Sequence, residues 1–345
     1  MEGLIPYQNY LLSKIFMLGL VIVSYPGKAQ QLVFTSNPVT RVLSGKVFRY
    51  TFSAIDSMGK AISYSVDNLP SWIQYEKNTQ TISGTTDKAG QYLVTIRAVT
   101  EDTVVGQNFM LTVYNKRTIN ILPLGNSITN GTGSYNSYRR SLWQLLHKAN
   151  FNFDMIGSWA LHHGGGPVPE PDFDMDHEGH SGWTAHDVLQ PPGWDEHRGN
   201  IDKWLLLYRP DIVLMELGTN EVFQCLGAEK ILDDMSLIIE KIRQKNKTVK
   251  ILIAQIPPLG EQWAAKKLCG TDTSYAEAIK IFNTSIVKFA QNNSTSRSSV
   301  IVVDQFTGVD PSKDMYDDIH PNTNGEKKMA ERWFKALAPL LRRRG

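Results

Sequence analysis

The chain has 345 residues, of which 41% are hydrophobic and 20% are charged. This composition excludes an intrinsically disordered protein and leaves room for one large domain beside a smaller one. The formal net charge is +2 and the only basic cluster is Arg342–Arg344 at the end of the chain, so no basic surface is expected and nucleic acid is excluded as a partner.

The first recognisable segment comprises residues 1–29. Lys14 precedes the apolar run Ile15–Val23, and Gly27 and Ala29 place small residues at the minus-three and minus-one positions of a cleavage site. This order is typical of a secretory signal peptide. A membrane anchor is the alternative, but the run is shorter than the roughly 20 residues that span a bilayer. We therefore expect a secreted, periplasmic or cell-surface protein whose mature form has no membrane contact.

Residues 30–115 show the period-two alternation of half-buried strands, as in Tyr92–Val99, with glycine-containing turns between the stretches. This pattern predicts a small all-β sandwich. Trp72 fits its core better than a sugar-binding surface. The stretches Leu69–Ile73 and Thr81–Thr85 resemble the cadherin-like, immunoglobulin-type modules of many secreted bacterial enzymes, and the resemblance implies a spacer domain.

From residue 116 to 345, apolar strands alternate with amphipathic helices. Strands are expected at Ile119–Leu124, Phe153–Ile156, Ile212–Leu217, Ile251–Ile256 and Val300–Val303. One helix carries an apolar face made of Ile231, Met235, Ile238, Ile239 and Ile242. The alternation predicts an α/β domain with a parallel sheet flanked by helices. Ligands of such sheets bind beyond the carboxyl ends of the strands.

Polar side chains suited to acyl transfer follow these strands. Ser127 comes after the first strand, and Asp317 and His320 lie three residues apart before the last helix. A serine hydroxyl becomes a good nucleophile when an imidazole takes its proton and a carboxylate orients that imidazole. We expect Ser127, His320 and Asp317 to form this triad. The alternative for Ser127 is a structural serine that caps the following helix.

Attack on an acyl carbon creates an oxyanion, which needs hydrogen-bond donors. The expected donors are the backbone N–H groups of Ser127 and Gly182 and the side-chain amide of Asn220. Gly182 has no side chain to prevent close approach. Thr323 and Glu326 are expected to form a capping box at the start of the last helix, which would anchor the base.

Four motifs carry these residues in a fixed order. They are Gly125–Thr129, His180–Trp183, Gly218–Glu221 and Asp317–Pro321. The ordered set resembles the four blocks of the SGNH/GDSL hydrolase superfamily, over roughly Ile119 to Leu341, which implies a flavodoxin-like fold and a serine esterase that needs no cofactor. The family's usual Asp is replaced by Asn126 before the serine and by Glu221 after Asn220. We expect the chemistry to survive these departures and the local hydrogen bonding to differ.

Further residues narrow the substrate. They are Pro123–Thr129, Tyr138–Arg139, Met155–Ser158, Asp176–Trp183, Gly199–Ile201 and Trp204. They resemble the acetyl-xylan-esterase group of the carbohydrate esterases, which implies removal of O-acetyl groups from an acetylated polysaccharide or oligosaccharide. The alternatives are a general arylesterase or short-chain lipase, and a non-catalytic carbohydrate-binding protein on a hydrolase scaffold.

Some residues leave more than one reading open. Arg139, His180 and Trp183 are candidates for lining the substrate crevice, although packing or pairing with an acid would explain them equally well. His177 and His180 show no recognisable metal-ligand spacing, so no metal site is expected. Cys225 and Cys269 either pair in an exported protein or stay unpaired in the core.

Overall fold

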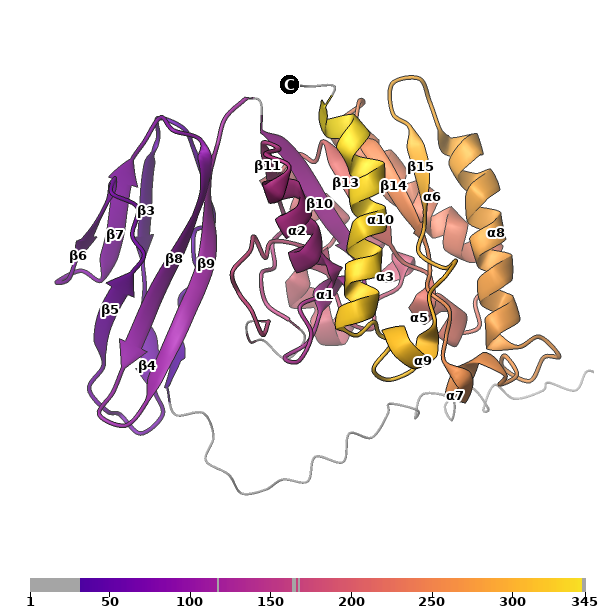
Figure 1. Ribbon diagram of the computed structural model, residues 1–345, viewed down its shortest axis with the longest axis horizontal. Coiled ribbons are helices and arrows are strands. Elements are labelled where there is room, and N and C mark those ends of the chain that lie inside the picture. Colours follow the sequence, from indigo (N-terminus) through magenta and orange to yellow (C-terminus); the bar gives the residue numbers. More distant parts are fainter. Residues whose placement is uncertain (1–31, 117, 163–165, 167, 343–345) are drawn as a thin grey trace, which may run out of the picture.

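The computed structural model describes residues 32–116, 118–162, 166 and 168–342. A β-rich part and an α/β part follow one another along the chain and lie side by side (Figure 1). The expected signal peptide, residues 1–29, lies outside the described residues. Within the described ranges, no helix is long and apolar enough to cross a membrane.

The β-rich part is a sandwich of two sheets with a common apolar core. Its strands are β1 (Leu32–Phe34), β2 (Arg41–Leu43), β3 (Val47–Thr51), β4 (Ala54–Asp56), β5 (Ser63–Asp67), β6 (Ile73–Glu76), β7 (Thr81–Thr85), β8 (Gly90–Val99) and β9 (Val104–Tyr114). One sheet has the order β2-β9-β8-β5, the other has the order β3-β7-β6, and β1 pairs with β4. Phe48, Ile82 and Phe109 are buried between the sheets. Trp72 is half-buried at the edge of this core, where its ring meets Phe48 edge-on.

The α/β part is built on a parallel sheet. Its strands are β10 (Ile119–Gly125), β11 (Phe153–Met155), β12 (Glu178–Gly179), β13 (Ile212–Glu216), β14 (Lys250–Gln255) and β15 (Val300–Asp304). The order is β11-β10-β13-β14-β15, and β12 pairs with the end of β10. The strands predicted from apolar runs are confirmed, and their ends differ by no more than one residue from the observed ones.

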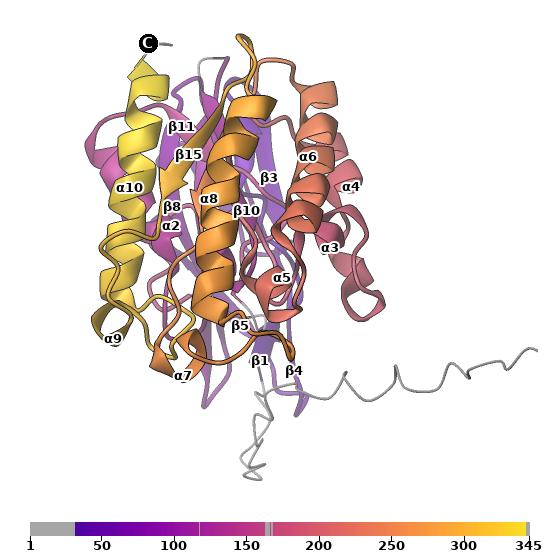
Figure 2. The same cartoon turned by 90° about the vertical axis from the view of Figure 1, so that its right-hand side faces the viewer.

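Helices cover both faces of this sheet, as Figures 1 and 2 show. They are α1 (Ser127–Asn130), α2 (Tyr138–Lys148), α3 (Ala185–Leu189), the 3-10 helix η1 (Gly193–Arg198), α4 (Ile201–Leu207), α5 (Thr219–Phe223), α6 (Ala228–Lys245), α7 (Glu261–Ala264), α8 (Tyr275–Asn293), α9 (Pro311–Asp314) and α10 (Thr323–Arg342). Helices α2 and α10 pack on one face, and α3, α4, α6 and α8 pack on the other. The predicted apolar face of α6 is fully buried. The predicted α/β fold with helices on both faces is confirmed.

Strand β10 lies inside the sheet although it contains a proline. Pro123 is paired with Leu214 of β13 on one side. On the other side, β10 pairs with β11 up to Ile121 and with β12 from Leu124. The missing N–H of Pro123 therefore coincides with the gap between two partner strands, where the ladder is already interrupted.

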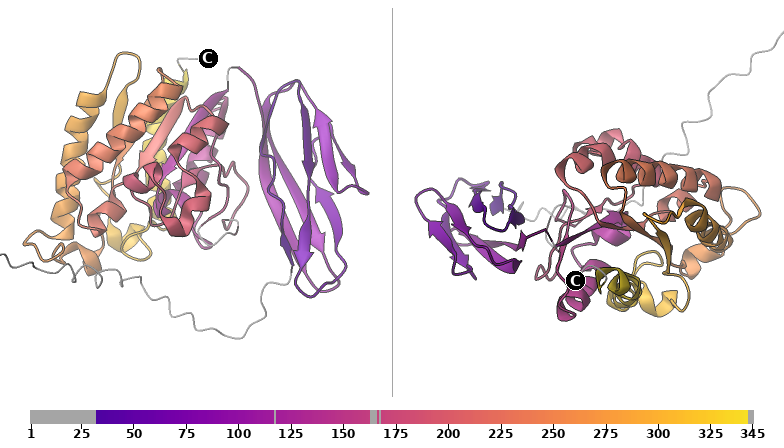
Figure 3. Two further views of the ribbon diagram at one scale, coloured as in Figure 1. Left: turned by 180° about the vertical axis from the view of Figure 1, so that it is seen from behind. Right: turned by 90° about the horizontal axis from the view of Figure 1, so that it is seen from above.

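The sandwich is packed against the β11 edge of the α/β part (Figure 3). Arg41 of β2 forms an ion pair with the buried Asp154 of β11 at 2.9 Å. Thr40 donates a hydrogen bond to Asp176 at 2.7 Å. Met110 of β9 is buried in the apolar cluster beneath α2. The sandwich thus shares polar and apolar contacts with the α/β part. Helices α1, α5, α7 and α9 lie towards the lower side of the α/β part in Figure 1.

Candidate active site

Ser127 lies at the carboxyl end of β10, where the strand turns into α1. The turn requires Gly125, because a Cβ on this residue would lie 2.4 Å from Thr129 Oγ1 and 2.5 Å from the carbonyl oxygen of Glu216. Contacts this short are not tolerated by a side chain. The close packing of strand and helix therefore sets the position of Ser127 at the edge of the sheet.

The cap of α1 is Asn126 and not the serine. The Asn126 side-chain oxygen accepts a hydrogen bond from the Ile128 N–H at 2.9 Å. Such a cap satisfies one of the free N–H groups at a helix start. Because Asn126 fills this role, the Ser127 hydroxyl is left for His320. The structural alternative considered for Ser127 therefore does not describe this helix.

Ser127, His320 and Asp317 form a continuous chain of hydrogen bonds. Ser127 Oγ lies 2.8 Å from His320 Nε2, and His320 Nδ1 lies 2.8 Å from Asp317 Oδ2. Half-burial by itself would raise the pKa of Asp317, but its hydrogen bond and charge interaction with His320 outweigh this effect and lower the pKa. The ionised carboxylate places the ring hydrogen on Nδ1. Nε2 is then free to accept the serine proton.

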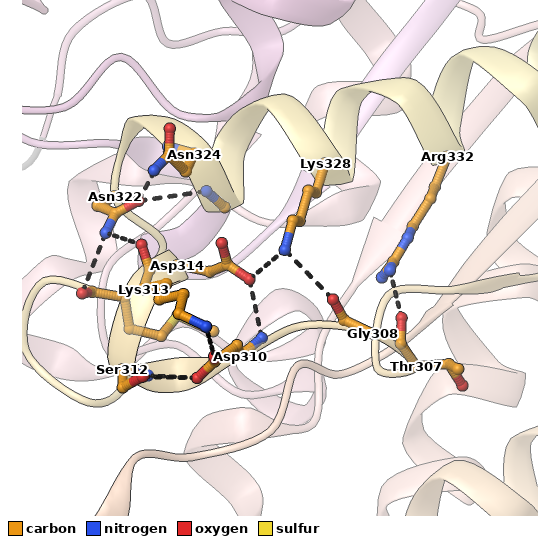
Figure 4. A network of polar contacts seen from close by, with 12 residues as sticks. Thr307, Gly308, Asp310, Ser312, Lys313, Asp314, Asn322, Asn324, Lys328 and Arg332 are labelled. Atoms are coloured by element: carbon orange, nitrogen blue, oxygen red, sulfur yellow. Dashed lines mark hydrogen bonds and ion pairs between the residues drawn. The ribbon is translucent and has the colours of Figure 1, made fainter.

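A polar network supports the loop that carries His320 (Figure 4). Lys328 of α10 contacts the Asp314 carboxylate at 2.6 Å, and the same carboxylate accepts the Asp310 N–H at 2.8 Å. The Asn322 amide donates to two main-chain carbonyls of the loop, at 2.9 and 3.2 Å. These contacts connect the start of the loop to α10 and to Asn322, the residue that precedes α10.

The predicted capping box at the start of α10 is wrong. Asn322 caps the helix instead, since its side-chain oxygen accepts hydrogen bonds from two N–H groups of the first turn, at 2.9 and 3.3 Å. Glu326 turns away from Thr323 and accepts the Ser137 N–H at 2.6 Å. The carboxylate therefore links α10 to the start of α2.

The segments that carry the expected oxyanion donors meet the end of β10, since the His180 N–H donates to the Gly125 carbonyl at 3.0 Å and Glu216 of β13 pairs with Gly125. Gly182 is exposed and has a φ of +81°, and beyond its two neighbours in the chain no residue has an atom within 4 Å of the position that a Cβ would occupy. The Asn220 side-chain nitrogen donates one hydrogen to the carbonyl of Trp183 at 2.7 Å. Since an amide nitrogen carries two hydrogens, the second is available to a ligand. This bond also joins Asn220 to the segment that contains Gly182.

Glu221 ties the same two segments together. Its carboxylate accepts the Ala185 N–H at 2.7 Å and the Gly218 N–H at 2.9 Å. Burial raises the pKa of Glu221 to about 7 against the opposing effect of these hydrogen bonds. The glutamate at this position therefore acts as a structural clamp between the start of α3 and the turn that precedes Asn220.

The candidate substrate contact Arg139 is corrected by the structure. Its side chain is fully buried and donates hydrogen bonds to the carbonyls of Thr129, Asn130 and Met175, at 2.7, 3.0 and 2.6 Å. Burial lowers the pKa of Arg139 to about 10, so the guanidinium remains charged at neutral pH. Arg139 satisfies the carbonyls at the end of α1, the helix that begins at Ser127. It thereby holds this helix in place.

His180 and Trp183 are also buried, with exposures of 2% and 0%, and they do not line the crevice. His180 stacks on Trp183 with ring centroids 4.3 Å apart and on Trp204 at 5.1 Å. His180 Nε2 lies 2.9 Å from a Glu178 oxygen, and the Trp183 N–H donates to Asp195. The stack therefore belongs to the buried core. The aromatic character of His180 and Trp183 does not by itself distinguish core packing from contact with a substrate.

His177 is buried and uses its ring for structure. Its Nδ1 accepts the Gly179 N–H at 2.8 Å, and burial lowers the pKa of His177 well below the ordinary value. Among the residues described, no group of three or more His, Cys, Asp or Glu side chains is arranged to hold a metal ion.

Cys225 and Cys269 form a disulfide, which resolves the alternatives left by the sequence. Their Cα atoms are 6.1 Å apart. The bond joins the end of α5, the helix that carries Asn220, to the loop between α7 and α8. It therefore restrains the segment that follows Asn220.

The sequence motifs did not identify two aromatic residues that lie beside the triad. Tyr316 stacks on Tyr135 with ring centroids 4.3 Å apart, and its ring is nearly parallel to that of His320 at 5.7 Å. Both tyrosines line a small cavity with Ser127 and His320. No motif singled them out, since isolated tyrosines in loops carry no periodic signal.

A helix-flanked parallel sheet with a Ser-His-Asp arrangement at its carboxyl edge defines a serine hydrolase of the α/β class. Residues 124–328 match the profile of the GDSL-like Lipase/Acylhydrolase family. The match covers more than half of the chain, and the chain belongs to this family. Residues 31–114 match the profile described as "Putative Ig domain".

Individual proteins add detail. A multidomain esterase of Ruminococcus flavefaciens is 30% identical over 239 residues, which cover 65% of this chain. The match spans 29% of that curated relative's own length. The crystal structure of an acetyl esterase mutant with acetate ion is similar with a TM-score of 0.54 and 27% identity, over 66% of this chain and all of that one. A carbohydrate esterase of family 3 from Talaromyces cellulolyticus is similar with a TM-score of 0.53 and 28% identity, over 66% of this chain and 99% of that one. The expected esterase class is confirmed.

Proposed function

We propose that this esterase removes O-acetyl groups from a polysaccharide or oligosaccharide. The observation that carries the proposal is the unbroken chain of hydrogen bonds from Ser127 through His320 to Asp317. Asn220 follows β13, the strand that pairs with β10, and is joined through the Trp183 carbonyl to the segment that contains Gly182. Similarity to an acetyl esterase and to a family 3 carbohydrate esterase supports the choice of acetyl group and sugar. The complete site disfavours a non-catalytic carbohydrate-binding protein.

The geometry suggests how the reaction proceeds. His320 Nε2 takes the Ser127 proton while Oγ forms a bond to the acetyl carbon, and Asp317 stabilises the imidazolium. The oxyanion accepts hydrogen bonds from the N–H groups of Ser127 and Gly182 and from the Asn220 amide. Collapse of the intermediate breaks the ester bond, and the sugar hydroxyl leaves with the proton held by His320. Water then attacks the acetyl-serine by the same route and releases acetate.

The test measures acetate release from acetylated xylan, pectin and chitin together with cleavage of 4-nitrophenyl esters. We expect release from at least one polymer, faster cleavage of the acetate than of the octanoate, and loss of all activity in Ser127→Ala with an unchanged circular dichroism spectrum. Ser134→Ala is the matched control, because Ser134 is exposed in the loop after α1. A fully active Ser127→Ala would refute the mechanism. Preference for the octanoate, without acetate release from any polymer, would favour a lipase.

We also propose that residues 1–29 direct export. The support is the order of basic, apolar and small residues, together with a disulfide between Cys225 and Cys269, which suits an oxidising compartment. Mass spectrometry of protein secreted by a bacterial host is expected to find a mature chain that begins at residue 30. A cell-retained chain with its N-terminus intact would refute this proposal.

A further inference from the structure

The ring stack beside the triad is not used by the mechanism above. Tyr135, Tyr316 and His320 come from two loops, residues 131–137 and 315–321, which lie far apart in the sequence. The first two rings are stacked with an interplanar angle of 8° and a centroid distance of 4.3 Å. The Tyr316 and His320 rings form an angle of 18° at 5.7 Å. The imidazole therefore faces an aromatic ring that is itself supported from a second loop.

The backbone adds to this contact. The Tyr316 N–H donates a hydrogen bond to the His320 carbonyl at 3.0 Å, and Met315 and Pro321 form an isolated bridge across the loop. The loop is thus closed on itself with Tyr316 opposite His320. Burial raises the pKa of Tyr316 to about 12, so its ring remains neutral over the range in which an esterase works.

His320 becomes positively charged during the reaction, and an aromatic ring stacked on it can stabilise that charge. When His320 takes the Ser127 proton, an imidazolium stands next to the developing oxyanion. A cation within about 6 Å of an aromatic centroid is attracted by the negative face of the ring. His320 is 23% exposed, so its cation is also partly solvated and the attraction lies at the weaker end of the known range.

We propose that Tyr316 is a positioning residue for His320, and that its ring, supported by Tyr135, keeps the imidazole in line with Ser127 and stabilises the imidazolium formed during catalysis. The proposal rests on the proposed function only in assigning the base role to His320. The Tyr316 ring lies nearly parallel to the imidazole, with centroids 5.7 Å apart, and acts on the reacting atoms through it.

Other charged groups lie near the imidazole. Asp317 contacts Nδ1 and Glu326 of α10 lines the same cavity as His320, whereas the Asp318 carboxylate lies against Gly260. Tyr138 of α2 lines this cavity as well. A test of the stack must leave these groups in place and change only the aromatic face.

The variants Tyr316→Phe and Tyr316→Leu satisfy this condition. Leucine fills much of the space and keeps water out but has no aromatic face, whereas phenylalanine keeps that face and loses the hydroxyl. For Tyr316→Leu we expect kcat on 4-nitrophenyl acetate to fall about two- to fivefold with KM unchanged, and the acid limb of kcat/KM to move about 0.4 to 0.7 pH unit towards lower pH. Tyr316→Phe is expected to have the kcat and the acid limb of the unmodified protein. Tyr135→Leu should give a smaller change in the same direction.

Tyr92→Leu is the control for loss of a tyrosine ring, because Tyr92 packs on Trp72 in the sandwich, away from the triad. A Tyr316→Leu enzyme with an unmoved pH profile would overturn the proposal. So would a Tyr316→Phe enzyme as impaired as the leucine variant, since the hydroxyl would then carry the effect.

A second measurement needs neither turnover nor a substitution at Tyr316. Proton NMR of the unmodified protein, with His320 assigned through the variant His320→Gln, should show the His320 ring protons shifted upfield by the Tyr316 ring current. If this shift is absent, the stacked arrangement of Tyr316 and His320 is refuted, even if Tyr316→Leu does not fold. An upfield shift in a protein that hydrolyses no ester would instead retain the stack and refute the proposed function.

Discussion

Glu216 allows a quantitative prediction about stability. Its side chain is fully buried at the end of β13, and neither carboxylate oxygen has a hydrogen-bond partner among the described residues. Burial, with a smaller contribution from the charge of Glu221, raises the pKa of Glu216 from 4.5 to about 8. Because the pKa is raised in the folded state, the associated stability is present below about pH 4.5 and is lost as the pH rises through about 8.

The expected size follows from linkage. Each pH unit between the two pKa values contributes about 1.4 kcal/mol, so the free energy of unfolding should fall by about 4 kcal/mol between pH 5 and pH 9 because of this group alone. Glu216→Gln keeps the shape of the side chain and does not titrate. Between pH 5 and pH 9, the free energy of unfolding of Glu216→Gln should therefore fall by about 4 kcal/mol less than that of the unmodified protein.

Urea unfolding followed by tryptophan fluorescence at pH 5, 7 and 9 measures this difference. Glu240→Gln on α6 is the matched control, because Glu240 is exposed and the same substitution there should leave the pH dependence unchanged. If Glu216→Gln and the unmodified protein lose stability in parallel, the carboxyl group is either solvated or paired in solution. That result would refute the argument.

The remaining predictions concern the oxyanion hole, the domain contact and the disulfide. Asn220→Ala should lower kcat on 4-nitrophenyl acetate about 10²- to 10³-fold with an unchanged circular dichroism spectrum; a loss below tenfold would remove the amide from the oxyanion hole. Arg41→Met leaves buried Asp154, whose pKa burial already raises to about 6, without its cation. The free energy of unfolding should then fall by about 2 kcal/mol at pH 8 and less at pH 5, where the carboxyl can protonate; equal losses at both pH values in urea melts would contradict this account. Replacing Cys225 and Cys269 by serine opens a loop with a sequence separation of 44 residues and should cost about 4 kcal/mol of stability in urea melts, a cost that must disappear when both proteins are reduced.

The strand predictions succeeded because the α/β sheet is buried on both faces, so each strand is a mostly apolar run bounded by polar turns. Single polar residues such as Asn120 in β10 and Asp154 in β11 do not hide this pattern. Strand β12, Glu178–Gly179, has no such run. It exists only because its backbone pairs with the end of β10, and pairing between distant segments leaves no periodic trace in either one. The prediction of a capping box at the start of α10 failed for a similar reason, because the N–H of the distant Ser137 binds the Glu326 carboxylate.

In the site, too, contacts between residues close in the sequence were predicted, whereas burial by distant segments was not. Asp317 and His320 are three residues apart, so their contact follows from a tight turn, and the motif order brings Ser127 to the same sheet edge. Arg139 and Trp183 were assigned to the crevice from their chemistry, but burial depends on what covers a residue. Arg139 is covered from all sides while its donors meet main-chain carbonyls, an arrangement that sequence alone does not reveal.

The two departures from the family pattern now have a physical explanation. At position 126 the cap requires an acceptor, and the amide oxygen of Asn126 supplies it as a carboxylate would, while avoiding a buried negative charge next to the serine. At position 221 the longer glutamate reaches the N–H groups of both Ala185 and Gly218. Both substitutions leave the reacting groups untouched, because the nucleophile, base and oxyanion donors use other atoms. The surrounding hydrogen bonds can therefore vary while the geometry of acyl transfer is retained.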